Sequence, residues 1–364
     1  MPLTASFLKR TFHFGFRAKT SRGVMRERDS WMIRVQDPRH PGIFGVGEAA
    51  PLPGLSTEWG DAFEGDVSRL VAQFNASQLD LPPNGGLGAV SEGLAEAIPG
   101  LLQFPSVLFA FEVALLDLCN GGRRVVFGNS FVEGKPIPIN GLIWMGGMDQ
   151  MLQQMEIKVQ DGFDCIKLKV GGLDFEKECD ILQYARRKYF KKDIELRLDA
   201  NGAFKGEEAM YKLHELSKFD IHSIEQPVSP GQGLMAGLCR ESPIPIALDE
   251  ELIGVPAEGR RALLEGLLPR FIILKPTLHG GLSGCADWIA LAEGLNIGWW
   301  MTSALESNIG LNAIAQFAAE YENGLPQGLG TGSIYDDNIG SPLEVRNGAL
   351  CHNGAKSWDL PTFD

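Results

Sequence analysis

The sequence lacks the cysteine patterns of disulfide-rich and zinc-binding proteins. Its six cysteines stand at positions 119, 165, 179, 239, 285 and 351, and none of them forms a Cys-x-x-Cys pair. No Cys/His cluster has the spacing of a zinc site. Cysteines scattered in this way through 364 residues are typical of small buried side chains in a reducing compartment.

Long apolar runs and an excess of positive charge are also absent. No stretch of about 18 apolar residues occurs, so no transmembrane helix is expected. The first ten residues contain no apolar core before a cleavage site, which argues against a signal peptide and makes the cytoplasm the expected location. The formal net charge of −13 argues against a nucleic acid or an acidic membrane as partner, because either would need a basic face.

The first third of the chain has a mixed pattern of strands followed by helices. Residues 5–49 alternate apolar and polar side chains and are interrupted by glycine-containing loops, which predicts an antiparallel meander. Residues 57–119 have helical patterns, most clearly at Ser106–Cys119. We therefore expect an α+β region over residues 1–134.

From about residue 135 to residue 341 short apolar strands alternate with amphipathic helix patterns. Eight strands are expected, at Ile137–Ile143, Cys165–Val170, Glu195–Ala200, Ser223–Gln226, Pro245–Leu248, Phe271–Lys275, Ile297–Thr302 and Gln327–Thr331. The helix patterns between them include Asp174–Lys191, Glu207–Lys218, Ala257–Leu267 and Leu282–Gly294. This alternation predicts an α/β fold, a (β/α)₈ barrel or a close variant.

Polar residues close most of these strands at intervals of 24 to 30 residues, about one βα unit. They are Lys169, Asp199, Glu225, Asp249, Lys275, Ser303 and Thr331. The carboxyl ends of barrel strands meet at one rim, where barrel enzymes build their active sites. We therefore expect these side chains to surround one site.

Three of these residues are carboxylates, Asp199, Glu225 and Asp249. Like charges at close range raise one another's pKa, so three converging carboxylates need a cation. Oxygen ligands favour Mg²⁺, with Mn²⁺ or Ca²⁺ as alternatives. Strand parity does not decide between Asp249 and Glu250 as the third ligand, and a strand-end ion pair or a helix cap is the alternative for any single acid.

Lysines flank the three acids. Lys167 and Lys169 share one face of their strand, and Lys275 closes the strand after the acids. Neighbouring cations lower the pKa of a lysine and so favour the neutral base. The alternative is that Lys167 pairs with an acid while Lys169 extends to the surface. Metal, acids and base together predict removal of an α-proton from a substrate carboxylate, with the metal stabilising the enediolate.

Five motifs resemble the muconate-lactonizing subgroup of the enolase superfamily. They are Lys167-x-Lys169, Asp199-Ala-Asn-Gly, Ile224-Glu225-Gln226-Pro227, Asp249-Glu250 and Lys275-Pro276. The resemblance implies a (β/α)₇β-type modified TIM barrel at residues 135–341 that carries the active site. It implies an N-terminal α+β capping domain at residues 1–134. Apart from the resemblance, the irregular tail at about 342–364 is expected to pack back on that domain through Val345 and Trp358.

The same resemblance implies roles for the site residues. Asp199, Glu225 and Asp249 would hold Mg²⁺. Lys169 and Lys275 would face the substrate from opposite sides, with Lys167 tuning Lys169. The loops at residues 20–25 and 48–55 would close over the rim and select the substrate, a small-molecule carboxylate.

Two segments near the end of the barrel narrow the resemblance to one branch of this subgroup. Ser303–Gly310 and Gly328–Gly332 resemble the branch that dehydrates a cyclohexadiene carboxylate to o-succinylbenzoate on the way to menaquinone. In that branch Lys169 would remove the α-proton and then protonate the departing hydroxyl, while Lys275 stays charged. Asn201 and Ser303 would line the substrate pocket, unless they only cap a turn and a helix.

Other functions are also compatible with the sequence. Dipeptide epimerases of the subgroup carry Asp-x-Asp at the last strand, where this chain has Gly330-Thr331-Gly332-Ser333. This difference counts against an epimerase but leaves an N-acylamino-acid racemase as an alternative. A third possibility is a non-catalytic barrel that keeps the metal for structure. The sequence does not decide between a monomer and a homo-oligomer.

Overall fold

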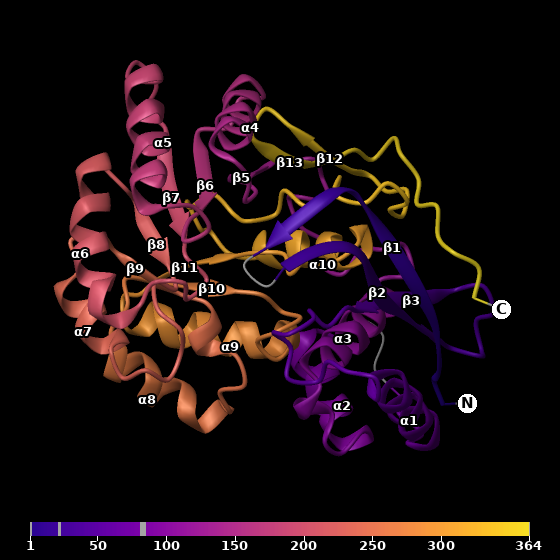
Figure 1. Cartoon of the computed structure of the whole chain (residues 1–364). Coiled ribbons are helices and arrows are strands. Elements are labelled where there is room, and N and C mark those ends of the chain that lie inside the picture. Colours follow the sequence, from indigo (N-terminus) through magenta and orange to yellow (C-terminus); the bar gives the residue numbers. More distant parts are fainter. Residues whose placement is uncertain (1, 21–22, 81–84, 364) are drawn as a thin grey trace.

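The computed structural model describes residues 2–20, 23–80 and 85–363. Among the described residues, an antiparallel sheet with three α-helices and a short 3₁₀ helix forms the N-terminal part, and a curled parallel sheet surrounded by helices forms the larger part (Figure 1). Within the described residues no helix is long and apolar enough to cross a membrane.

The N-terminal sheet is the antiparallel meander that the sequence predicts. Its strands are β1 (Thr4–Thr20), β2 (Gly23–Gln36) and β3 (Phe44–Ala49), paired in that order. The helices are α1 (Phe63–Ala76), α2 (Leu87–Ala97), α3 (Pro105–Cys119) and the short 3₁₀ helix η1 (Leu101–Gln103). Helix α3 lies directly on β3. The two backbones are so close that a Cβ added at Gly47 would come within 1.9 Å of the Ala110 carbonyl oxygen.

In the described part of the chain, seven parallel strands form the barrel sheet in the order of their sequence. They are β5 (Gly141–Ile143), β6 (Cys165–Lys169), β7 (Glu195–Asp199), β8 (Ser223–Glu225), β9 (Ile246–Leu248), β10 (Phe271–Leu274) and β11 (Gly298–Met301). The helices around them are α4 (Met148–Gln160), α5 (Phe175–Lys188), α6 (Gly206–Leu216), η2 (Ser217–Phe219), α7 (Met235–Glu241), η3 (Glu250–Leu252), α8 (Ala257–Leu267), α9 (Gly281–Gly294) and α10 (Asn308–Ala318).

The barrel closes through a segment that is less regular than the sequence predicts. Gln327–Thr331 forms no extended strand and makes only single parallel bridges, between Ile139 and Gln327 and between Thr302 and Gly328. Space at this seam is tight, since a Cβ at Gly328 would lie 2.4 Å from Thr302 Oγ1. The expected strand Ile137–Ile143 is correspondingly split into β4 (Ile137–Pro138) and β5.

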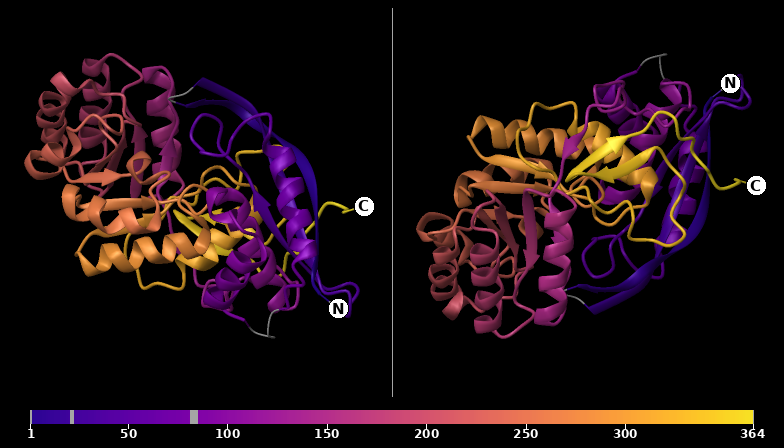
Figure 2. Two further views of the ribbon diagram at one scale, coloured as in Figure 1. Left: turned by 90° about the horizontal axis from the view of Figure 1, so that it is seen from below. Right: turned by 90° about the horizontal axis from the view of Figure 1, so that it is seen from above.

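The C-terminal segment contacts both parts of the molecule. Strands β12 (Leu343–Arg346) and β13 (Ala349–His352) form a hairpin that pairs with β4. Val345 leaves 40% of its surface exposed. Trp358 packs against the apolar cluster around Phe12 and Phe14, and the end of the chain lies beside the N-terminal strands (Figure 2). The domain division near residue 134 remains our proposal.

Two fully buried glutamates of the N-terminal part bind the amino ends of barrel helices. Glu112 on α3 accepts hydrogen bonds from the backbone N–H groups of Leu282 (2.6 Å) and Ser283 (3.2 Å) at the start of α9. Glu48 on β3 accepts from the N–H groups of Ser307 (2.9 Å) and Gly310 (3.0 Å) at the start of α10. The first N–H groups of a helix have no partner within it, so these carboxylates join the N-terminal part to the barrel.

This contact predicts a pH-dependent contribution of Glu112 to stability. Burial raises the pKa of Glu112 to about 7 against the hydrogen bonds that oppose it, so between its unfolded pKa of about 4.5 and pH 7 the folded state binds more protons. The free energy of unfolding of the wild type relative to E112Q should therefore fall by about 2–3 kcal/mol as the pH rises from 4.5 to 7.5. Urea unfolding of both proteins across this range measures the difference, and a pH-independent difference would contradict the prediction.

Candidate active site

The barrel strands bring six charged side chains to one rim. Lys167 and Lys169 lie on β6, Asp199 and Glu225 end β7 and β8, and Asp249 and Lys275 follow β9 and β10. The pairing register places Lys169 beside Asp199 and Asp199 beside Glu225. Residues opposite each other in adjacent strands point to the same face, so the structure gathers all six side chains.

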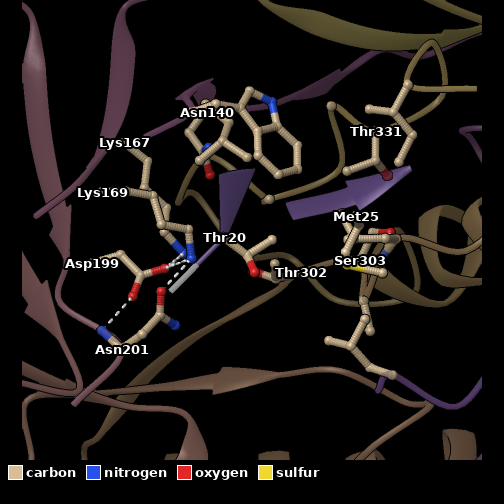
Figure 3. A pocket seen from close by; sticks show the side chains of 18 of the residues that line it. Thr20, Met25, Asn140, Lys167, Lys169, Asp199, Asn201, Thr302, Ser303 and Thr331 are labelled. Carbon is tan, nitrogen blue, oxygen red and sulfur yellow. Dashed lines mark hydrogen bonds and ion pairs between the residues drawn. The ribbon is translucent and has the colours of Figure 1, made fainter. Parts of the chain in front are cut away.

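The six side chains form a chain of alternating charges. Lys169 Nζ lies 2.7 Å from Asp199 Oδ2, and Lys167 Nζ lies 2.9 Å from the same oxygen (Figure 3). Lys167 also contacts Glu225 Oε2. Lys275 Nζ lies 3.8 Å from Glu225 Oε1 and contacts Asp249 Oδ2. Among the six, Lys169 is the most accessible, with 15% of its side chain exposed.

Burial and pairing shift the pKa values of this network in opposite directions. Burial raises the pKa of Asp199, but Lys167 and Lys169 outweigh it and hold that pKa below its usual range. Burial keeps the pKa of Asp249 well above its usual range in spite of Lys275. Burial alone would lower the pKa of Lys167 and of Lys275. Their carboxylate neighbours raise the pKa of each lysine by more than burial lowers it, so both lysines stay protonated.

Lys167 contacts two of the three carboxylates, and its expected role in tuning Lys169 stays a prediction. Its ammonium group lies between the carboxylates of Asp199 and Glu225. These two negative charges offset its positive charge and so reduce its repulsion of Lys169. Lys167 therefore holds Asp199 and Glu225 next to each other. This pairing is the alternative that the sequence left open for Lys167.

The carboxylates fit a hard divalent cation by their chemistry. Glu225 Oε1 and Asp249 Oδ1 are buried and accept no hydrogen bond from the described residues, and oxygen donors are what Mg²⁺ prefers. As the side chains lie, however, no three acidic, histidine or cysteine groups among the described residues converge with metal-ligand geometry. Lysine ammonium groups lie between the carboxylates.

Asn201 connects Lys169 to Glu250. Its side-chain oxygen accepts a hydrogen bond from Lys169 Nζ at 2.6 Å, and its amide nitrogen donates to Glu250 Oε1 at 3.0 Å. The backbone of Asn201 is left-handed, with a φ of 43°, which asparagine tolerates better than most residues. Glu250 thus contacts Asn201, whereas Asp249 belongs to the alternating chain of charges, and Asp249 as the third ligand stays a prediction.

Ser303 also lies on the cavity wall. Its hydroxyl donates to Glu306 Oε2 at 2.6 Å and accepts from the N–H of Leu305 at 3.0 Å. The side chain that caps helix α10 is that of Ser307, not Ser303. Ser303 is therefore placed at the site by a buried glutamate.

The charged rim forms one side of a cavity of about 690 Å³. Lys169, Asp199 and Asn201 lie on one side of it and Ser303 and Thr331 on the other (Figure 3). The two loops expected to cover the rim contribute Thr20, Gly23, Val24, Met25, Leu52, Pro53 and Leu55 to the lining. Residues 21 and 22 of the first loop lie outside the described residues.

The sequence analysis missed Arg28, which fastens the second loop to the rim. Arg28 is 3% exposed, and its guanidinium donates to the backbone carbonyl oxygens of Ala50 and Ala304. Nothing in the alternating pattern of β2 distinguishes this arginine from its exposed neighbours. Its partners are 22 and 276 residues away, so only the folded chain shows the contact.

Comparison with known proteins agrees with this architecture. Residues 150–353 match the family described as enolase C-terminal domain-like, which is more than half of the chain. The chain belongs to this family of the enolase superfamily, whose members use Mg²⁺. The fold class expected from the sequence, a modified TIM barrel with a capping domain, is confirmed.

One relative with substantial identity is o-succinylbenzoate synthase from Desulfotalea psychrophila. It is 43% identical over 350 residues, which cover 92% of this chain and 94% of the relative. The crystal structure of MenC from the same organism aligns with a TM-score of 0.83 at 38% identity, over 96% of this chain and all of that one. The structure of a dipeptide epimerase from Cytophaga hutchinsonii, complexed with Mg and a dipeptide, aligns with a TM-score of 0.79 at 20% identity. The alignment covers 98% of this chain and 96% of that chain, and at this identity it shows a shared fold alone.

Proposed function

We propose that this chain dehydrates 2-succinyl-6-hydroxy-2,4-cyclohexadiene-1-carboxylate to o-succinylbenzoate, a step of menaquinone biosynthesis. The observation that carries the proposal is the 43% identity, over 92% of the chain, to an o-succinylbenzoate synthase. The rim supports it independently, because it offers lysines and carboxylates for an α-proton abstraction. The reaction removes one proton and one hydroxyl group as water and makes the ring aromatic.

Lys169 is the proposed base. It is the most accessible of the six charged side chains, and Asn201 and Asp199 fix its ammonium nitrogen at 2.6 and 2.7 Å. In its neutral form Lys169 takes the proton from the carbon next to the ring carboxylate. It then gives that proton to the departing hydroxyl, which leaves as water. One side chain can do both because the two groups belong to one small ring.

Lys275 is the proposed electrostatic partner. It comes from β10, four strands along the sheet from β6, and stays protonated beside Asp249. A fixed positive charge stabilises the negative charge that develops on the substrate carboxylate as the proton leaves. Lys275 therefore supports the enediolate from the side opposite Lys169.

Asp199, Glu225 and Asp249 are the proposed ligands of Mg²⁺, with Mn²⁺ as an alternative. When bound there, the ion would supply the positive charge that makes the α-proton more acidic and stabilises the enediolate. Lys167 would keep Asp199 and Glu225 together, since it contacts both.

The rest of the cavity suits a ring that must be kept from water. Phe16, Leu52, Leu142 and Trp144 line it together with the charged rim. Apolar walls exclude water and strengthen the electrostatic contacts inside the site. Arg28 supports this enclosure by holding the loop around Ala50 against the barrel.

The test is turnover of the cyclohexadiene substrate by the purified protein with Mg²⁺. We expect o-succinylbenzoate to accumulate and to be detected by its ultraviolet absorption and by mass spectrometry. No product at any Mg²⁺ or Mn²⁺ concentration would refute the proposal. Solvent deuterium at the α-carbon of an N-acylamino acid, without any dehydration, would instead identify the protein as a racemase.

A dipeptide epimerase receives no support from the cavity. The segment Gly330–Ser333 has no acidic residue that could hold an ammonium group. The two acids that follow are engaged elsewhere, since Asp337 Oδ2 lies 2.8 Å from His13 Nδ1 and Asp336 faces Gly15.

A further inference from the structure

A fourth lysine, Lys158 of helix α4, lines the same cavity as Lys167, Lys169 and Lys275. Each of the other three contacts a carboxylate. In the part of the chain that the structure describes, no carboxylate lies within 4.0 Å of Lys158 Nζ, and its side chain makes no hydrogen bond. The mechanism proposed above gives Lys158 no task.

The surroundings of Lys158 are largely apolar. Its methylene groups pack on Gly141, where an added Cβ would lie 3.1 Å from Lys158 Cγ, and its Nζ lies 5.0 Å from the ring centre of Phe163. Burial lowers the pKa of Lys158, against the weaker opposing effect of Asp161. An ammonium group in such a place is costly without an anion, and a cation–π contact offsets only part of that cost.

The cavity extends from the charged rim to Lys158, which packs beside Gly141 of β5. Leu142 lies next to Lys167 in the sheet register, whereas the adjacent Gly141 faces helix α4, and the cavity has lining residues on both sides of this strand. Beyond β5 the described chain continues the barrel only through single bridges of Gln327 and Gly328. Asn140, Leu142 and Phe163 line the cavity together with Lys158 and with the charged rim, so one continuous cavity joins the rim to Lys158.

The substrate of the proposed reaction carries two carboxylates. One is on the ring, next to the carbon that loses its proton, and belongs at the charged rim. The other ends the succinyl arm and needs a separate positive partner. Among the described lining residues, Lys158 is the cation that is not already paired with a carboxylate.

We propose that Lys158 binds the carboxylate of the succinyl arm and thereby makes the enzyme selective for dicarboxylates. The proposal rests on the proposed function. It assigns Lys158 to substrate binding and not to the chemistry at the ring, so its loss should weaken binding while the bound substrate still reacts.

The test compares K158M, which keeps the length of the side chain and removes its charge, with K158R and the wild type. K177M is the matched control, because Lys177 lies on the next helix with 55% of its side chain exposed and pairs with Asp174. We expect K158M to raise KM about tenfold or more, as loss of a partner from a partly buried charge pair does. Its kcat should stay within about threefold of the wild type, and K158R should recover most of the binding.

A second measurement separates the arm from the ring. Calorimetry in Mg²⁺ should compare the binding of o-succinylbenzoate with that of 2-butanoylbenzoate, which lacks the terminal carboxylate. The wild type and K177M should prefer the dicarboxylate by about tenfold or more, and K158M should bind the two compounds nearly equally.

The outcomes distinguish this proposal from the one on which it rests. An undiminished preference for the dicarboxylate in K158M, in a wild type that turns over the substrate, would overturn the role of Lys158 alone. A loss of kcat with unchanged KM would also overturn it. A wild type that neither binds o-succinylbenzoate nor forms it would refute both.

Discussion

Alanine at Lys169 is expected to lower kcat by at least about 10³-fold, within the range seen when a general acid–base group is removed. Lys169 would supply both the base for the α-proton and the acid for the departing hydroxyl, and among the described residues no other amine contacts both Asn201 and Asp199. The measurement is formation of o-succinylbenzoate under saturating substrate and Mg²⁺. Binding of o-succinylbenzoate to K169A should persist.

K275A is the companion variant. It should also lose turnover while its Mg²⁺ affinity is retained, because Lys275 would stabilise charge and would not bind the ion. Exchange of the substrate α-proton with deuterated solvent separates the two lysines, since it requires the base. Normal turnover by K169A would show that the base lies elsewhere, and normal turnover by K275A would contradict the assignment of Lys275 to the opposite face.

The second large effect is expected at the third carboxylate. D249N should weaken activation by Mg²⁺ by two orders of magnitude or so, because replacing a carboxylate by a neutral amide removes a charged oxygen ligand of a hard cation. Asp249 is fully buried and contacts Lys275, whereas Glu250 contacts Asn201. E250Q should therefore change the activation much less. Activity measured against Mg²⁺ concentration, after treatment with a chelator, compares the two variants.

The contrast between D249N and E250Q decides a choice that sequence parity leaves open. Both changes replace an acid by its amide, so they alter shape very little. If E250Q lost Mg²⁺ activation and D249N kept it, Glu250 would be the third ligand. Addition of excess Mg²⁺ should restore the chelated wild type, which serves as the control for reversible removal of the ion.

Most of the charged rim could be predicted from the sequence because each residue closes a local apolar strand. Lys169, Asp199 and Glu225 lie side by side since parallel strands in register bring their carboxyl ends together. The spacing of one βα unit can be read from the local sequence, and the folded sheet keeps it because the strands pair in sequence order. The period predicted that the six side chains would lie at one rim. It did not predict that the ammonium groups of Lys167 and Lys275 would lie between the carboxylates.

The contacts that the sequence did not reveal are those between distant segments. The single bridges at Gln327 and Gly328 depend on how closely the barrel closes. Glu112 gave a partial signal, because an acid inside the largely apolar helix α3, which also holds the buried Asp117, requires a polar partner. Its partners, at the start of α9, lie 170 residues later, and no local pattern identifies them. Lys158 gave no signal, since its charge resembles that of any exposed helix position.

The glutamates that join the two parts of the molecule also have a consequence for biosynthesis. Glu48 leaves the ribosome long before Ser307, which follows it by 259 residues. At 5–20 residues per second this interval lasts about 13 to 52 s. During that time helix α10 does not yet exist, so Glu48 lacks the hydrogen bonds that it accepts from Ser307 and Gly310 in the folded protein. The N-terminal segment, although made first, therefore reaches its final packing only after the last barrel helix emerges.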